Sequence, residues 1–414
     1  MANPQPAPAA GTRAVVAGSL GNFIEFYDWT IYGLLATVFS AQMFPGSDPS
    51  VALLVSLGTF AIGFLARPIG AIVLSPLGDR HGRRWLFSLT VLGIGAGSLV
   101  IAVTPTYASI GLAAPVLILL ARIVQGLAAG AEFQTGVAYL TEHSPARRRG
   151  FIGSFQVASI VLGTLAASLV SQATSALIGA EAFAAWGWRI PFAFGALLAL
   201  YGFFLRTRAT ETPVFEQVRA ERELDRADRT GLRQHWLACV QVASINLSTV
   251  PYYLWTVFLP TYAHLTTGIP LAEAFLANAV ALAVFALVLP FAGMLSDRIG
   301  RKPMLLAGAV GLVLGAYPML AAVRSGGFVT LLLVSIAGCL LLACIDGVMA
   351  ATYSELLPAH IRVTGIGIPY ALVSAVFGGT APLITAAFLR AGAPDLVAVY
   401  IIAVMVVAGA TWVF

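Results

Sequence analysis

The chain has 414 residues, of which 59% are hydrophobic and only 10% are charged, whereas a soluble protein carries about 25% charged residues. Apolar runs of about 18 or more residues recur along the whole length, and each could cross ~30 Å of hydrocarbon as a helix. This composition excludes a single soluble core and predicts an all-α polytopic membrane protein. The net charge of +5 does not indicate a nucleic-acid partner, because the basic residues lie between the apolar runs.

Two bundles of six spans are expected in chain order. Residues 1–14 form a Pro/Ala-rich tail without the features of a secretory signal, which we expect in the cytoplasm. The bundles cover 15–206 and 234–414, and the mixed-charge segment 207–233 joins them either as an amphiphilic helix or as a solvated linker. The last span ends at Phe414 without a basic tail, and we expect the natural chain to continue. The twelve expected spans are 15–40, 51–77, 85–105, 113–140, 150–175, 188–206, 235–263, 272–296, 303–323, 327–357, 362–389 and 395–414.

The basic residues predict the orientation of these spans. Of the 23 Lys and Arg residues, 18 fall on the side of the N-terminus, 3 fall on the opposite side, and Arg67 and Arg122 lie inside spans. Loops rich in Lys and Arg stay in the cytoplasm. The N-terminus is therefore expected inside, in a plasma membrane that would be the inner membrane of a bacterium.

Two loop motifs occur once in each half. The run SPLGDRHGRR (75–84) returns as GMLSDRIGRK (293–302), and EHSPARRRG (142–150) returns as ELLPAHIRVTG (355–365). Each half places the first motif after its second span and the second motif after its fourth. This repeat predicts two pseudo-symmetric six-helix halves in parallel orientation, as in alternating-access carriers.

These motifs resemble the signature of the major facilitator superfamily. The runs GNFIEFYDWTIYG, RPIGAIVLSPLGDRHGRR and ARIVQGLAAGAEF, with WGWRIPF, resemble the metabolite:proton symporter family, whose members move organic anions such as 2-oxoglutarate, citrate and shikimate, or zwitterions such as proline and betaine. YASIGLAAPVLILLARIVQG and WGWRIPFAFGA look closest to its 2-oxoglutarate permease branch. Two positions depart from the pattern: Ser75 stands where the motif usually begins with Gly, and Ala131 stands where a second Gly is favoured before Glu132.

Several ionisable residues fall inside expected spans, where each costs roughly 2.5–3.5 kcal/mol at the bilayer centre and is a functional candidate. Glu25 and Asp28 share one face of the first helix because they are three residues apart. On the fourth helix, Arg122, Gln125 and Glu132 form one polar stripe that should face the bundle interior.

A carboxylate in a poorly hydrated cavity can bind a proton, whereas an arginine stays charged and suits a substrate carboxylate. We therefore expect Glu25 or Asp28 to carry a coupling proton, with Glu132 in reserve, and Arg122 to bind the anion. The alternative is a static ion-pair lattice between the first and fourth helices.

Further candidates are less specific. Arg67 is either a second anion contact or a locally paired or snorkelling side chain. Asp346 is either the second-half counterpart of the site on the fourth helix or a helix-packing partner. Polar and aromatic residues are expected to complete the substrate site, although any one aromatic side chain is more often a packing or interface residue. The expected substrate-binding residues are Arg122, Gln125, Tyr32, Asn246, Tyr253 and Arg67.

The cytoplasmic motifs have a separate expected role. In the family that they resemble, such turns latch the two halves together, with Glu142 or a helix end as possible partners. The alternative is that they only retain topology through positive charge. The residues concerned are Asp79, Arg80, Gly82, Arg83 and Arg84 in the first half, and Asp297, Arg298, Gly300 and Arg301 in the second.

The leading functional prediction is proton-coupled symport of a small organic anion, a di- or tricarboxylate of the 2-oxoglutarate type, by a monomer working through alternating access. The alternatives are symport of a zwitterionic osmolyte of the proline or betaine type, an exporter or uniporter, and a receptor or channel. The chain has no GxxxxGK[S/T], HExxH or GxSxG run, and its only lysine is Lys302. We expect no enzymatic activity, no cofactor and no metal site.

Overall fold

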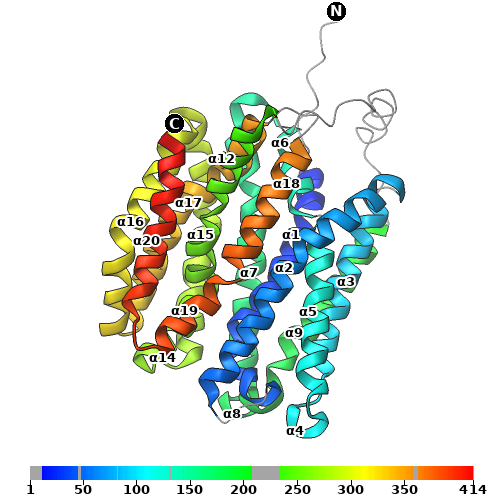
Figure 1. The fold of residues 1–414 in the computed structure, drawn as a ribbon, viewed down its shortest axis with the longest axis vertical. Coiled ribbons are helices and arrows are strands. Elements are labelled where there is room, and N and C mark those ends of the chain that lie inside the picture. The colour runs from blue at the N-terminus through cyan, green and yellow to red at the C-terminus, as the bar shows by residue number, and fades with distance from the viewer. Residues whose placement is uncertain are drawn as a thin grey trace, which may run out of the picture.

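The computed structural model describes residues 12–44, 48–81, 83–130, 132–142, 144–207, 234–357 and 362–413. This part of the chain is a bundle of long helices, with the first half of the sequence on one side and the second half on the other (Figure 1). The segment that joins the halves, expected over 207–233, lies outside the described residues apart from Thr207. The all-α, twelve-helix architecture is confirmed.

The first half contains the first six expected spans, with the fourth span divided in two. Its long helices are α1 (Thr12–Met43), α2 (Pro49–His81), α3 (Arg83–Val103), α5 (Ala113–Ala129), α6 (Phe133–Glu142), α7 (Arg149–Ile178) and α9 (Arg189–Thr207). Short connections are α4 (Tyr107–Ile110), η1 (Ala146–Arg148), α8 (Ala180–Ala182) and η2 (Phe183–Gly187).

The second half contains the remaining spans, of which the seventh and eleventh are broken. Its helices are α12 (Trp236–Asn246), α13 (Thr249–Tyr253), η3 (Leu254–Phe258), α14 (Leu259–Thr267), α15 (Leu271–Ile299), α16 (Arg301–Ser325), α17 (Phe328–Leu356), α18 (Arg362–Val373), η4 (Ser374–Gly378), α19 (Ala381–Arg390) and α20 (Asp395–Val413).

The breaks have local causes. A proline inside a helix removes a backbone donor and clashes with the carbonyl four residues earlier. Pro251 and Pro260 flank the π-helical turn η3, and Pro369 and Pro382 flank the π-helical turn η4. Such π turns are frequent at functional sites. Both broken spans lie at the boundary between the halves, where they position the candidate site.

Seven of the described helices are long and apolar enough to cross a membrane, and the pair Ala180–Gly187 and Arg189–Phe204, bent by 58°, could form an eighth span. The breaks explain part of the difference between this number of membrane-crossing helices and the twelve expected spans. Helix α5 has only 17 residues, and the seventh span is divided into pieces of at most 11 residues. Each expected span still corresponds to one helix or to one run of consecutive helices.

The two halves meet closely along α7 and α15. Near one end, Gly150 and Gly293 face each other with no room for a Cβ atom on either residue. Toward the other end, the Ser168 hydroxyl donates a hydrogen bond to the Phe275 carbonyl at 3.1 Å. Small residues allow such close backbone approach between membrane helices.

Candidate functional site

Both carboxylates of α1 form ion pairs with arginines from other helices of the first half. Arg67 Nη2 on α2 lies 2.7 Å from Glu25 Oε1, and Arg122 Nη1 on α5 lies 3.6 Å from Asp28 Oδ2. All four side chains are at most 3% exposed. Burying a charge is costly unless it is paired, so each arginine compensates the carboxylate that it faces.

A hydrogen-bond network holds the Asp28–Arg122 pair in place. The Ser98 hydroxyl donates to Asp28 Oδ1, and Arg122 Nη1 donates to Gln125 Oε1 at 2.9 Å. Gln125 Nε2 in turn lies 3.4 Å from Ser98 Oγ. Gly97 leaves the space in which the Gln125 side chain lies. Helices α1, α3 and α5 therefore converge on one buried polar cluster.

Aromatic rings surround both guanidinium groups. The Trp29 ring centroid lies 4.3 Å from Cζ of Arg67 and 3.9 Å from Cζ of Arg122. Arg67 also lies over Phe64, at 4.4 Å, and Arg122 over Tyr32, at 4.7 Å. Cation–π contacts of this kind are worth about 2 kcal/mol or more when desolvated. Trp29 thus lies between the two ion pairs and contacts both arginines.

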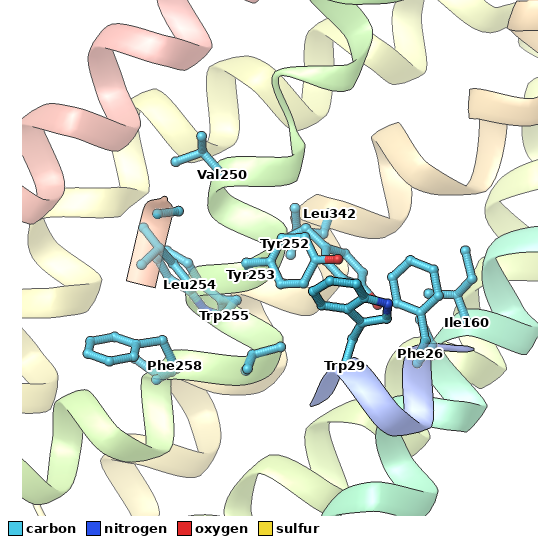
Figure 2. Packing of buried hydrophobic residues seen from close by; sticks show 14 of the residues in the cluster. Phe26, Trp29, Ile160, Val250, Tyr252, Tyr253, Leu254, Trp255, Phe258 and Leu342 are labelled. Carbon is cyan, nitrogen blue, oxygen red and sulfur yellow. The ribbon is translucent and has the colours of Figure 1, made fainter. Parts of the chain in front are cut away.

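A cavity lies between the halves, next to these ion pairs. The empty space in it, which includes the part that opens outward, is about 370 Å³. In Figure 2 the rings of Phe26 and Trp29 on α1 point toward Tyr252 and Tyr253 on α13. The lining residues are Phe26, Phe133, Val157, Ile160, Asn246, Ser248, Thr249, Tyr252, Tyr253, Asp346, Met349 and Tyr370.

Contacts between the halves narrow the cavity on both sides. Toward the end predicted to be cytoplasmic, the rings of Phe133 and Tyr370 stack with centroids 3.8 Å apart and planes 2° apart. Toward the opposite end, the Val257 side chain fills the space beside Gly33. At that end's surface, Arg390 Nη2 lies 2.9 Å from Asp48 Oδ2, between α19 and the start of α2.

Only two of the six expected substrate-binding residues line the cavity, namely Asn246 and Tyr253. Asn246 Nδ2 donates at 2.9 Å both to the Tyr370 carbonyl and to Ser374 Oγ. The other four expected residues are buried in the first half, because the carboxylates of α1 draw the arginines inward. These four are Arg122, Gln125, Tyr32, whose hydroxyl donates to the Ser56 carbonyl at 3.1 Å, and Arg67.

The three expected proton carriers gather in one region. Glu25 and Asp28 lie beside the cavity residue Phe26 in the sequence, and Glu132 is 2% exposed and close enough to Glu25 for their charges to interact. The lattice alternative predicted ion pairs between the first and fourth helices. Asp28 does pair with the fourth span through Arg122, but Glu25 pairs with Arg67 of α2.

Part of the aromatic lining of the site was not predicted from the sequence. Phe26, Phe133 and Tyr370 line the cavity and were not among the expected site residues. The signal that could have found two of them is their position directly beside intramembrane carboxylates, since Phe26 follows Glu25 and Phe133 follows Glu132.

The second-half motif joins the two halves at the end predicted to be cytoplasmic. Asp297 accepts hydrogen bonds from the backbone N–H groups of Gly150, at 2.9 Å, and Phe151, at 3.0 Å, at the start of α7. Arg301 pairs with Asp297 at 2.8 Å and with Glu355 at 3.0 Å. A carboxylate at a helix N-terminus is stabilised by the helix dipole.

The other motif residues divide into two groups. Gly300, at φ +94°, ends α15, and Arg298 is exposed. In the first-half motif, Gly82 and the side chains of Asp79, Arg80, Arg83 and Arg84 lie outside the described part of the structure, as does the side chain of Glu142, their expected partner.

Residues 18–382 match the sequence model of the Major Facilitator Superfamily. The chain belongs to this superfamily. Its relatives include a proline/betaine transporter of Salmonella typhimurium (strain LT2), 32% identical over 96% of this chain and 81% of the relative. A citrate-proton symporter of Klebsiella pneumoniae is 33% identical over 93% and 87% of the two chains, and the alpha-ketoglutarate permease of Escherichia coli (strain K12) is 35% identical over 89% and 85%.

Among solved structures, the superfamily member XylE, a proton:xylose symporter, superposes with a TM-score of 0.76 at 19% identity, over 96% of this chain and 94% of that one. At this identity the likeness concerns the fold alone. The expected membership in the superfamily is confirmed, and the chain is a multi-pass membrane protein.

Proposed function

We propose that this superfamily member is a proton-coupled symporter of a small solute that carries a carboxylate. The observation that carries the proposal is the pairing of two buried carboxylates with two buried arginines beside a cavity between the halves. In this proposal the chain is a monomer in a bacterial inner membrane, has its N-terminus in the cytoplasm, and moves its solute by alternating access without converting it.

The ion pairs supply a physical route to coupling. When Asp28 binds a proton, it loses the charge that holds Arg122, while Arg122 stays protonated. The freed guanidinium can then form a bidentate contact with a carboxylate of the solute. The same exchange is available to Glu25 and Arg67. Proton binding and solute binding therefore favour each other, which is the requirement for symport.

Two solute classes share the carboxylate that this scheme needs. Two buried arginines could serve an organic anion with two or more carboxylates, of the 2-oxoglutarate or citrate type. The five aromatic rings among the residues that line the cavity are the observation that favours a zwitterion of the proline or betaine type instead. The relatives include a proline/betaine transporter, a citrate-proton symporter and an alpha-ketoglutarate permease, so both classes occur among them.

Purified protein in liposomes tests the proposal. With an inward proton gradient, we expect wild-type protein to accumulate at least one of labelled 2-oxoglutarate, citrate, proline or betaine. Asp28→Asn should lose gradient-driven accumulation but keep exchange of solute across the membrane, because the pair can no longer bind or release a proton. Glu181→Gln, which changes an exposed carboxylate, is the matched control. Accumulation by Asp28→Asn at the wild-type level would remove Asp28 from the coupling step.

A further inference from the structure

The cavity contains a carboxylate that the coupling scheme does not use. Asp346 on α17 lines the cavity and is 2% exposed. Its Oδ1 atom is 3.5 Å from the Ser248 hydroxyl, at the limit of a hydrogen bond, and its Oδ2 atom has no hydrogen-bond partner among the residues that the structure describes. Within the described ranges, no arginine, lysine or histidine forms an ion pair with it, in contrast to Glu25 and Asp28.

A buried carboxylate in this position requires compensation. Its charged form is expensive without a cation or several hydrogen-bond donors. Two compensating species are available to a proton symporter, namely a proton and a positively charged group on the solute. The other side chains of the cavity distinguish between them.

Five aromatic side chains line the same cavity: Phe26, Phe133, Tyr252, Tyr253 and Tyr370. Tyr252 packs edge-to-face against Tyr253, with centroids 5.4 Å apart, and against Phe26, with centroids 6.5 Å apart (Figure 2). Its hydroxyl lies within electrostatic range of Asp346. Aromatic faces attract cations, above all quaternary ammonium groups that cannot donate hydrogen bonds. A protonated, neutral Asp346 would leave these faces without a charged partner.

We propose that Asp346, together with Phe26, Tyr252, Tyr253 and Tyr370, binds the ammonium group of the transported solute, which is therefore a zwitterion. This inference rests on the proposed symport function and names the solute class for it. Arg67 lies over the ring of Phe26, with its Cζ atom 5.9 Å from the ring centroid, so a positive charge of the first half lies next to the cavity lining and is available to the carboxylate of the zwitterion. A tricarboxylate would instead place negative charge beside Asp346.

The inference is tested by betaine uptake and equilibrium exchange in proteoliposomes, with citrate and 2-oxoglutarate assayed in parallel. We expect wild-type protein to transport betaine and not citrate. Asp346→Asn should raise the KM for betaine about tenfold or more in both assays, because it removes the charge that faces the ammonium group. Tyr252→Phe keeps an aromatic face and should raise the KM for betaine less than Tyr252→Leu, which removes that face. Glu273→Gln, an exposed change, is the control.

Each contrary result has a separate meaning. If Asp346→Asn loses gradient-driven uptake but keeps its KM for betaine in equilibrium exchange, Asp346 carries a proton and the inference is wrong. Gradient-driven uptake of citrate or 2-oxoglutarate in place of betaine would also overturn the inference, while the proposed symport function would stand. No gradient-driven uptake of betaine, proline, citrate or 2-oxoglutarate would instead contradict the proposed function. Retention of the wild-type elution profile in size-exclusion chromatography shows that each variant folds.

Discussion

At the scale of single residues, the central feature is a set of buried charges whose partners differ between the halves. The first half pairs each carboxylate of α1 with an arginine, whereas the second half leaves Asp346 facing the cavity. The sequence alone placed all these charges inside the membrane. It did not predict that Glu25 would take Arg67 as its partner, because the choice depends on how α1 and α2 are rotated about their axes.

The Asp28–Arg122 pair predicts a stability effect. Arg122→Gln leaves a buried carboxylate without its cation and should destabilise the protein by about 3–5 kcal/mol. The double variant Asp28→Asn/Arg122→Gln should recover most of this loss, because no unpaired charge remains. Denaturant unfolding in detergent measures the free energies for the corresponding double-mutant cycle.

A surface pair provides the comparison for that cycle. Arg390 and Asp48 are both more than 40% exposed, and exposed pairs contribute about 0–1 kcal/mol. Arg390→Gln should therefore cost little. If Arg122→Gln lowers the free energy of unfolding as little as Arg390→Gln does, Arg122 does not compensate a buried negative charge on Asp28.

At the scale of helices, prolines in the seventh and eleventh spans lie close to the points at which the structure breaks those spans. The structure places a π-helical turn before Pro260 and another before Pro382, so this part of the site could be read from the sequence. The division of the fourth span around residues 130–132 was not predicted. Gly130 was a possible indication, but the preceding apolar pattern reads as one continuous helix.

The link between α7 and α15 carries a prediction at this scale. Asp297→Asn removes a negative charge from the first turn of α7 and from Arg301, so the contact between the halves should weaken at this end. Hydrogen exchange at Gly150 and Phe151 should become faster. Arg298→Gln, at an exposed neighbouring position, is expected to leave exchange unchanged. Unchanged protection in Asp297→Asn would show that the positive charges of the motif act on topology alone.

At the scale of the whole molecule, the repeated motifs predicted two six-helix halves, and this arrangement follows from counting apolar runs. The composition of the cavity could not be predicted in the same way. Phe26, Phe133 and Asp346 come from distant parts of the sequence, and they meet only because the halves pack along α7 and α15. Spacing within one helix shows which residues share a face, but it does not show what the opposite half places against that face.

Solute-driven proton movement tests proton-coupled symport most directly. A pH-sensitive dye outside proteoliposomes without an imposed gradient reports whether added betaine, 2-oxoglutarate or citrate carries protons inward. We predict that the transported solute makes the external medium more alkaline with wild-type protein, and that Asp28→Asn abolishes the signal while solute exchange continues. Solute entry without any change in external pH in the wild-type protein would contradict proton-coupled symport.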